Sequence, residues 1–550
     1  MKLKPAVFVL AAALSGVGGS HGQTLVAGDI AVLQFNPSTT DRIVVMPLVN
    51  LAANTSFTIT DNGWLSSNGN GFTTTEGKLV FTVPSGGIRA GTLLKYENGS
   101  LPNTTTGFLS VSPSNFALNT SNDSLIIVRG TDTAVTSTTN ISEVIYGIQS
   151  DASSPHAWDA SGSTAPTSAR PQLADTNLTP VMQGVNGVYS GVTTAVDRGS
   201  WITRLGATGN RTYSPTSQSL MAATSYAVTS NITWTGSTST WSSATSVTNW
   251  DRSSNTTWFN HGDSVTFGST GVGTILIEAA GITAGNLTFS SSGYTIQSNI
   301  LTLAGAASTV NVITSGHVAT VNSIVSGSGG LTKTGAGTLI LGGANDYSGA
   351  TLVSAGKLVV TDTIGSSAVI VSGSGAVLAS DTVATIGSTL TIQSGAILAV
   401  GDAANASTAT ATVIGATTFS NDSIFSWDIN NAGTSYDKLV TSSLVDGDAV
   451  GGAVFRIVAA DATFASTFWK TSQTWTDIFT TSGSAGIDNW ATIFGNAVSV
   501  VDNSFGSITP VGGSFSVSGS TLTWSAVPEP TSALAGLLIT AGLLRRRRVA

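Results

Sequence analysis

The sequence predicts an all-β protein in which a right-handed parallel β-solenoid follows an antiparallel β-sandwich and leads into a short β-rich C-terminal cap. Three observations lead to this fold class: a repeat of about twenty residues, short apolar runs broken by glycine and serine, and a charged fraction of only 9%. Ordinary soluble domains carry roughly 25% charged residues. Here glycine, serine, threonine and asparagine replace them, while 41% hydrophobic residues in patterned runs argue against disorder. Many short strands joined by polar turns fit this composition.

One short phrase, a glycine followed by any residue and then two apolar or small residues, recurs through the middle of the chain. Its five glycines are Gly316, Gly337, Gly356, Gly375 and Gly395. The steps between them are 21, 19, 19 and 20 residues. A period near twenty is typical of stacked β coils, and helices of about 11 residues do not fit between such closely spaced breakers. One coil cannot bury its own apolar face, so we expect stability to come from stacking on neighbouring coils.

The first 23 residues have the pattern of a secretory signal peptide. Lys2 and Lys4 precede an apolar run at residues 6–17, and small residues follow within positions 18–22. This is the order of a signal peptide, with cleavage expected near Gly22 and Gln23. We therefore expect the chain to be secreted across the inner membrane of a bacterium.

Residues 24–226 form a predicted first domain without repeats. Strand-like runs lie at residues 29–35, 42–48, 56–60, 78–83, 92–96, 124–129 and 143–146. Turn signals such as Asn36-Pro37 and Asn98-Gly99 separate the runs, and about seven short strands indicate an antiparallel sandwich. Residues 161–217 are expected to be loops.

Several phrases of this domain, including GDIA at residues 28–31, FTITDNGW at residues 57–64 and PSGG at residues 84–87, are similar to lamin-tail-like domains of secreted bacterial proteins. The resemblance implies an interaction or packing module. Asp61 and Asn62 supply oxygen ligands beside a glycine, but the further acids and closing glutamate of an EF-hand calcium loop do not follow. We interpret the phrase as a tight turn that carries a core tryptophan, Trp64.

Residues 227–419 are predicted to form the solenoid, and its first part is rich in tryptophan: Trp234, Trp241, Trp250 and Trp258. If exposed, these rings would stack on sugars, as at carbohydrate-binding surfaces. If buried, they would cover the open edge of the first coil, which would otherwise aggregate. We favour the cap, since a solenoid requires terminal caps and does not require a sugar site.

Residues 327–358, GSGGLTKTGAGTLILGGANDYSGATLVSAGKL, resemble the autotransporter-associated β-strand repeat of bacterial surface proteins. The resemblance implies an extracellular β-solenoid but no particular chemistry. Asn345 and Tyr347 could belong to a ligand site; we favour a corner of the coil, because asparagine tolerates the αL conformation and stacks in ladders. We expect Leu339 to face the solenoid interior.

Residues 420–526 depart from the repeat and are predicted to cap the solenoid. Residues 425–429 alternate like a strand, and residues 515–517 and 522–524 return to strands. Between them, five large side chains fall roughly on one helical face and predict an aromatic helix. These side chains are Phe468, Trp469, Trp475, Ile478 and Phe479.

Residues 527–550 have the pattern of a sorting signal. A VPEP motif at residues 527–530 precedes an apolar run at residues 533–544 and four arginines. Twelve residues span about 18 Å as a helix, short of a hydrocarbon core of about 30 Å, so the segment is a poor permanent anchor. The pattern resembles the PEP-CTERM sorting signal of Gram-negative bacteria. That resemblance implies transient insertion in the inner membrane, recognition by an exosortase, which is a membrane transpeptidase-like enzyme, and transfer to the envelope surface or matrix. The sorting residues are Val527, Pro528, Glu529, Pro530, Arg545, Arg546, Arg547 and Arg548.

The sequence offers little for catalysis or metal binding, and we assign no catalytic, cofactor-binding or metal-binding residue. There is no cysteine, which excludes disulfides and thiol chemistry. The histidines outside the signal peptide, His156, His261 and His317, are too few and scattered for a triad or a zinc site. The acids of the solenoid are also widely spaced, at Asp263, Glu278, Asp346, Asp362, Asp381 and Asp402.

The charge balance argues against nucleic acid as a partner. Removing Lys2, Lys4 and the four arginines lowers the basic residues from 21 to 15, and removing Glu529 lowers the acids from 29 to 28, so the net charge is −13. We interpret the chain as a secreted, non-enzymatic structural or adhesive protein, with an exosortase as processing partner and exopolysaccharide or other surface proteins as candidate neighbours. The alternative is a carbohydrate-binding protein or a polysaccharide-degrading β-helix enzyme.

Overall fold

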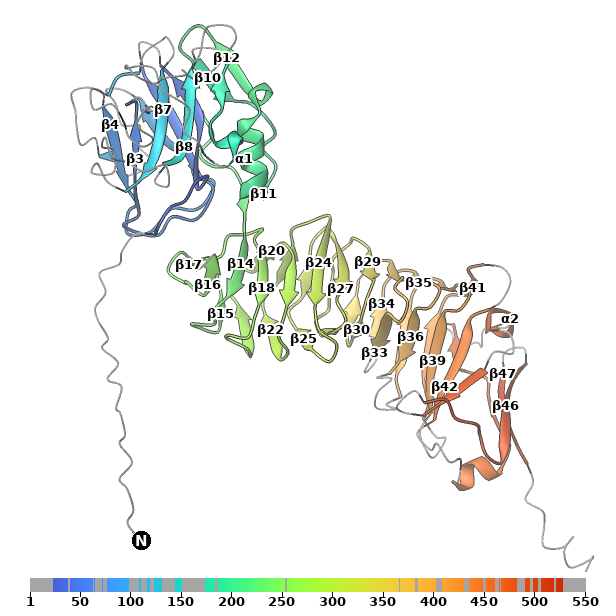
Figure 1. The fold of residues 1–550 in the computed structure, drawn as a ribbon. Helices are drawn as coiled ribbons and strands as arrows, with labels where there is room; N and C mark the ends of the chain where they lie inside the picture. Colours follow the sequence, from blue (N-terminus) through green and yellow to red (C-terminus); the bar gives the residue numbers. More distant parts are fainter. Residues whose placement is uncertain are drawn as a thin grey trace, which may run out of the picture. The chain divides into compact units, whose positions relative to one another are not determined.

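The structure, a computed structural model of the 550-residue chain, describes residues 23–527 apart from internal gaps. The gaps are residues 38–39, 63, 65–71, 73–76, 98–107, 110–115, 119–122, 131–143, 151–172, 174, 184–185, 253–254, 366, 381–383, 402–407, 430–434, 449–451, 460–463, 465, 482–489, 495–497, 503–505 and 519–520. The chain divides into two compact units, Met1–Ser230 and Asn231–Ala550 (Figure 1). The finer domain boundaries expected at residues 420 and 527 stay predictions. Parallel strand pairing nevertheless continues past residue 420, through the strands Ile424–Ile429, Val454–Ala459 and Val498–Val501.

The first unit contains two mainly antiparallel sheets, as predicted (Figure 1). In its described part, one sheet has the order β12 (Arg211–Ser214), β10 (Asn186–Tyr189), β1 (Ile30–Asn36), β2 (Arg42–Pro47) and β5 (Leu94–Glu97). The other has the order β6 (Phe108–Leu109), β4 (Lys78–Thr82), β3 (Ser56–Thr60), β7 (Ser124–Arg129), β8 (Val144–Ser150) and β9 (Val181–Met182). Apolar side chains of both sheets meet in one core, to which Val32 and Ile127 contribute.

The expectation of loops at residues 161–217 is wrong for much of that region. Besides β9, β10 and β12 it contains η3 (Thr176–Leu178), β11 (Val196–Asp197), α1 (Arg198–Gly206) and η4 (Thr208–Asn210), and β11 pairs with β13 (Val228–Thr229). Asp197 caps the N-terminus of α1. Its carboxylate accepts the Ser200 amide at 3.0 Å, and this hydrogen bond lowers the pKa of Asp197. The helix buries Trp201 and Leu205 against the sheets. Tertiary burial therefore stabilises a helix whose glycines give it weak intrinsic propensity.

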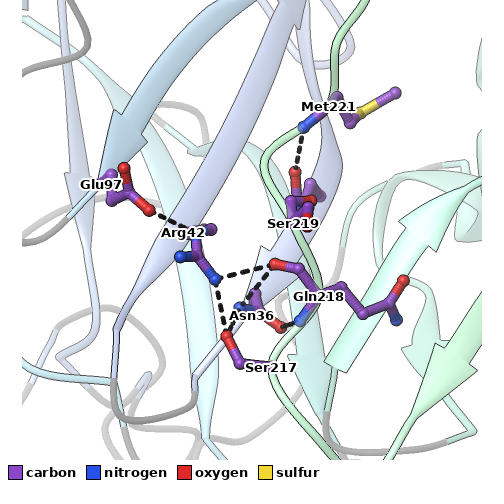
Figure 2. A network of polar contacts seen from close by, with 8 residues as sticks. Asn36, Arg42, Glu97, Ser217, Gln218, Ser219 and Met221 are labelled. Atoms are coloured by element: carbon purple, nitrogen blue, oxygen red, sulfur yellow. Dashed lines mark hydrogen bonds and ion pairs between the residues drawn. The ribbon is translucent and has the colours of Figure 1, made fainter.

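Residues 217–221 run beside the first sheet as a strap that polar side chains hold in place (Figure 2). Gln34 and Asn36 of β1 are fully buried and pair with backbone groups of the strap through their side-chain amides, at 3.0–3.1 Å. Arg42 of β2 donates to the carbonyl oxygen of Gln218 at 2.9 Å. The side-chain amides of Gln34 and Asn36 thus bond to the strap in the way that the backbone of a neighbouring strand would. These buried amides therefore remain hydrogen-bonded.

The second unit is a parallel β-solenoid with three sides, and Figure 1 shows its coils stacked side by side. Within the described residues, the first side contains β17 (Asn255–Thr257), β16 (Trp250–Arg252), β14 (Asn231–Trp234), β18 (Ser264–Phe267), β21 (Leu287–Phe289), β24 (Ala307–Val312), β27 (Gly330–Thr334), β29 (Thr351–Val353), β32 (Val369–Val371), β35 (Leu390–Ile392), β38 (Thr417–Phe419) and β41 (Leu444–Asp446). The second contains β15 (Thr240–Trp241), β19 (Thr274–Ile277), β22 (Tyr294–Ser298), β25 (Val318–Val321), β28 (Thr338–Leu341), β30 (Lys357–Val360), β33 (Val377–Ser380), β36 (Ile397–Val400), β39 (Ile424–Ile429), β42 (Val454–Ala459) and β45 (Val498–Val501).

The third side is built from two shorter sheets that an isolated bridge between Asn345 and Ile364 connects. Its strands are β20 (Ile282–Ala284), β23 (Leu301–Leu303) and β26 (Val325–Ser326), then β31 (Thr363–Ile364), β34 (Ala384–Ile386), β37 (Thr410–Val413), β40 (Lys438–Thr441) and β44 (Phe479–Thr480). Strands of successive coils pair in parallel on all three sides, which confirms the predicted parallel solenoid.

Side chains alternate between the solenoid interior and its outer surface, as strand geometry requires. On the second side, the register stacks one interior column of Ala319, Leu339, Leu358, Leu378 and Leu398. Leu339 is fully buried, which confirms its predicted orientation. Four of the five repeated glycines, Gly316, Gly356, Gly375 and Gly395, have a positive φ, and an added Cβ at Gly337 would lie 2.7 Å from the carbonyl oxygen of Thr314. At Gly356, φ is 65° and an added Cβ would lie 2.4 Å from carbonyl oxygens of the preceding coil.

The C-terminal part adds a small antiparallel sheet of β43 (Gln473–Trp475), β47 (Thr521–Ala526) and β46 (Gly513–Ser518), with η5 (Thr467–Lys470) and α2 (Trp490–Phe494). The predicted aromatic helix is wrong: Phe468 and Trp469 lie in η5, Trp475 lies in β43 and Phe479 lies in β44. Phe479 pairs with Leu439 on the third side of the solenoid. The β-branched threonines between the aromatic residues favour strands, and pairing with existing sheets outweighs the helical spacing.

Candidate functional site

The sorting motif lies almost wholly outside the described residues. Of the eight predicted sorting residues the structure describes Val527; the other seven, between Pro528 and Arg548, are not described. The Val527 amide donates to the carbonyl oxygen of Gly512 at 2.7 Å, and its side chain is exposed. Within residues 23–527, none of the described helices has the length and hydrophobicity that a membrane span requires.

The tryptophans at the start of the solenoid are buried. Trp234, Trp241 and Trp250 are at most 1% exposed, and Trp258 is 4% exposed. The ring centroid of Trp250 lies 4.9 Å from that of Trp234 and 5.3 Å from that of Trp241. The antiparallel hairpin of β16 and β17 lies beyond β14 and covers the first parallel strand. These rings therefore cap the solenoid and leave no exposed platform on which sugars could stack.

Lys333 is a buried amine inside the repeat. It takes an interior position of β27, in register with valines of the coils before and after it. Its Nζ donates to the carbonyl oxygens of Thr334, Gly335 and Ala355 at 2.7, 2.9 and 3.2 Å. Burial lowers the pKa of Lys333 to about 8. The amine thus binds the carbonyl groups of a corner and is closed to external ligands.

Asn345 connects three successive coils at one corner. Its Oδ1 accepts the Val325 amide at 2.9 Å, and its Nδ2 donates to the carbonyl oxygens of Gly343 and Thr363 at 2.6 and 3.1 Å. The predicted corner is correct, but the predicted αL conformation is wrong, because Asn345 is not among the residues with positive φ. Its side-chain amide supplies both a donor and an acceptor to the neighbouring coils, so a left-handed backbone is not needed.

Tyr347 is also enclosed in the repeat. Its hydroxyl lies 2.7 Å from Thr351 Oγ1, which lies 3.2 Å from Ser367 Oγ, and Ser367 donates to the carbonyl oxygen of Gly349 at 2.5 Å. Burial raises the pKa of Tyr347 to about 12. The tyrosine and the asparagine of the repeat therefore stabilise corners and do not face a ligand.

Two acids near the start of the solenoid, Asp263 and Glu278, fix local turns. Asp263 is buried and accepts the Asn260 amide at 2.9 Å through Oδ2. Glu278 accepts the hydroxyl of Ser242 at 2.5 Å and the amide of Ser243 at 2.8 Å. Burial alone would raise the pKa of the Glu278 carboxyl, but these hydrogen bonds outweigh it and hold the pKa below its usual value. The Glu278 carboxylate is therefore held in a structural role.

The remaining acids and histidines are not assembled into a site among the described residues. Asp346 and Asp362 are exposed, and His261 accepts the Thr283 amide at 3.0 Å. In the part of the chain that the structure describes, no group of three histidine, cysteine or acidic side chains is placed to hold a metal ion. His317 is described and half-buried, whereas His156, Asp381 and Asp402 lie outside the described residues.

Two carboxylates that the sequence did not single out lie close together in β39 and just before β40. Asp437 is fully buried and accepts the amides of Ala409 and Asp428 at 2.9 and 2.8 Å. Burial and then the charge of Asp428 raise the pKa of Asp437 well above its usual value. The alternation of residues 425–429 predicted the strand, but it did not indicate that Asp437 would accept the amide of Asp428.

From β14 to β27, the outer surface of the first solenoid side carries two columns of uncharged polar side chains. We call these residues the polar array. One column follows β14, β18, β21, β24 and β27 in register and contains Thr233, Thr266, Thr288, Asn311 and Thr334. The second contains Ser264, Asn286, Thr309 and Thr332. The second column is apolar at β29 and β32, with Leu352 and Ile370, and returns to threonine at β35 and β38, with Thr391 and Thr418. Threonines alternating with apolar residues were visible in the sequence, but their alignment required the register.

A comparison with known protein families supports the predicted repeat. The Passenger-associated-transport-repeat family matches residues 331–360, which in the structure run from β27 to β30. This match confirms the predicted autotransporter-associated β-strand repeat. The matched residues include Lys333, Asn345 and Tyr347. The part of the chain that matches the family is therefore also the part in which buried polar side chains hold the corners of the coils.

A second similarity is to a named adhesin. The chain is 43% identical over 98 residues to the adhesin BmaC autotransporter of Brucella suis biovar 1 (strain 1330). The alignment covers 18% of this chain and 3% of the adhesin. The aligned segment is therefore a small part of both proteins, and this chain spans only a small share of the adhesin's length.

Proposed function

We propose that this chain is an exported, non-enzymatic adhesive or structural protein of the bacterial cell surface or extracellular matrix. The observation that carries the proposal is the passenger repeat at residues 331–360 within a continuous parallel solenoid. The partial similarity to an autotransporter adhesin supports the same class of function. A solenoid suits this role because each added coil extends its side faces without requiring a larger core.

Sorting through the C-terminal motif is part of the proposal. The signal peptide directs the chain across the inner membrane, and the arginines from Arg545 to Arg548 stay on the cytoplasmic side. The apolar run then places the VPEP motif just outside the bilayer. Pro528 and Pro530 keep the motif extended, since proline has no N–H and disfavours helix before it. An exosortase cleaves there. The exposed side chain of Val527, directly after β47, is consistent with access to the motif.

The first unit is proposed to act as a lamin-tail-like interaction or packing module. Its two antiparallel sheets are compatible with that family's fold. Trp64 supports the interpretation of the DNGW phrase as a structural turn, because it is 3% exposed and packs edge-on against Phe72 at 5.1 Å. The Asp61 carboxylate accepts the Ala117 amide at 3.1 Å and so holds a neighbouring loop segment.

Attachment assays test the proposed function. A strain without the chain should adhere less to surfaces or to its own matrix, and the wild-type chain should restore adhesion. A chain with Pro528→Ala and Pro530→Ala should not restore it, whereas Thr531→Ala, a matched change beside the motif, should. Incubating the purified chain with a panel of polysaccharides tests the enzymatic alternative, since release of soluble sugar would contradict a non-enzymatic role.

A further inference from the structure

The polar array is solvent-accessible and has unused hydrogen-bonding capacity. Among the described residues, the hydroxyls of its six threonines have no hydrogen-bond partner and stand at partly or fully exposed positions. These are Thr233, Thr266, Thr288, Thr309, Thr332 and Thr334. The interior side chains between them, such as Val265 and Leu331, are buried and fix the strands beneath. The array is therefore a row of free hydroxyls on a rigid support.

The spacing of the array is set by the fold. Neighbouring coils lie about 4.8 Å apart, and alternate residues of one strand lie about 7 Å apart. The register pairs Thr266 with Thr288, and Thr309 with Thr332, so hydroxyls recur at the coil spacing along each column. Each threonine presents a donor, an acceptor and a methyl group. A ligand that fits this surface needs polar groups and small apolar patches at a similar repeat.

The array carries no charge. Between Ser264 and Thr332, Glu278 is the only Asp, Glu, Lys or Arg in the sequence, and serine groups hold its carboxylate. At the first end of the array, the half-buried Asp251 of β16 lies in register with Thr233. Lys333 lies between two array positions, but its amine points inward to corner carbonyl groups. A polyanion would lose hydration along these columns and gain no counter-charge from them, and a polycation would gain only that of Asp251. The surface therefore favours an uncharged partner.

We propose that the polar array binds a neutral polysaccharide, with an extended β-linked glycan chain lying along the stacked coils. The proposal rests on the adhesive function proposed above and names its ligand class. An extended β-1,4-linked chain repeats its pyranose rings at a spacing close to that of the coils, and its hydroxyls are uncharged donors and acceptors. The threonine methyl groups contact the C–H faces of the rings. Leu352 and Ile370 interrupt the second column after β27, so we place the site on the coils from β14 to β27.

Binding of this kind is multivalent. A single hydroxyl contact contributes little, because it replaces a hydrogen bond to water. Successive contacts along one rigid face act together once the first ring is bound, since the remaining contacts become intramolecular. Binding should therefore depend on several array threonines at once and should change little with salt, because no ion pairs are formed.

Retention of the purified full-length chain on microcrystalline cellulose and on chitin tests this inference, with the anionic polymer polygalacturonate as a comparison. The test variant combines Thr266→Val, Thr288→Val and Thr334→Val, which remove hydroxyls but keep β-branched shape. The matched control combines Thr302→Val, Thr385→Val and Thr412→Val on the third side, where these threonines are similarly half-exposed. We expect retention on a neutral glycan to fall at least about tenfold in the test variant and to be unchanged in the control. Thr288→Val alone should give a smaller loss.

Three outcomes would overturn the inference: no retention of the wild-type chain on either neutral glycan, equal retention of the test and control variants, or stronger retention on polygalacturonate. Self-association of the wild-type chain that the test variant abolishes, without glycan retention, would assign the array to contacts between copies of this chain and would also overturn it. The measurement uses purified protein, so its failure leaves export and sorting standing. Failure of export in cells likewise leaves the binding result standing.

Discussion

Replacing Leu339 by alanine tests the register of the solenoid directly. Leu339 is fully buried in an interior column between Ala319 and Leu358. Removing a buried leucine side chain costs about 2–5 kcal/mol of unfolding free energy, with larger values where neighbours cannot fill the space. Ala319 is too small to fill it and the strands of both adjacent coils are hydrogen-bonded, so we expect a loss of about 3–4 kcal/mol.

Urea denaturation measures this loss, and hydrogen exchange locates it. Contacts in a solenoid reach only neighbouring coils, so faster exchange should be concentrated in β25, β28 and β30. Ile340→Ala is the matched control, because Ile340 is the next residue on the same strand and faces outward with partial burial. It should cost less than about 1.5 kcal/mol. If Ile340→Ala were as costly as Leu339→Ala, or costlier, the strand would be shifted by one residue, which exchanges its two faces.

Three further changes test the corners and the interior. Asn345→Ala leaves the buried Val325 amide without its acceptor and should cost about 2–4 kcal/mol in urea denaturation; a loss below about 1 kcal/mol would show that the corner does not depend on it. Lys333 has a pKa of about 8 in the folded chain against an ordinary value of 10.5, so the unfolded chain binds more protons between these values and stability should rise with pH across that window. Between pH 7 and pH 10, the free energy of unfolding of the wild-type chain should rise by about 1–3 kcal/mol relative to that of the Lys333→Met variant, since the carbonyl acceptors partly stabilise the ammonium. If the difference in unfolding free energy between the two chains were the same at both pH values, the lowered pKa of Lys333 would be contradicted. Ala411→Val should fill a cavity of about 20 Å³ beside it and raise the free energy of unfolding by about 0.5–2 kcal/mol; a lower Tm would show that the cavity walls cannot accept the added methyl groups.

Much of the solenoid could be predicted from local sequence because its determinants are periodic. The spacing of Gly337, Gly356 and Gly375 sets the coil length, and the apolar residues that follow these glycines set the inward faces. Leu339 illustrates this, since strand alternation alone predicted its burial. The four tryptophans of the cap were also predictable, because an open parallel edge has to be covered.

The structural features that the sequence did not predict depend on contacts between residues far apart in the chain. Arg211 donates to the carbonyl oxygens of Val32 and Leu33 at 2.7 and 3.0 Å, where β1 has an irregular register, and no local pattern links residues so far apart. Phe479 was assigned to a helix because its spacing from other aromatic residues is helical, but pairing with Leu439 places it in a strand. The polar array likewise becomes visible only when the register aligns successive coils.

Export and sorting to the cell surface is the central proposal, and the intact mass of the chain recovered from the cell surface tests it most directly. The proposal predicts a protein that begins near Gln23 and ends near Pro528 to Pro530, without the arginine-rich tail. The variant with Pro528→Ala and Pro530→Ala should instead be recovered from the membrane fraction at a mass that includes the tail. Surface protein from wild-type cells that still contains residues 545–550 would contradict the proposal.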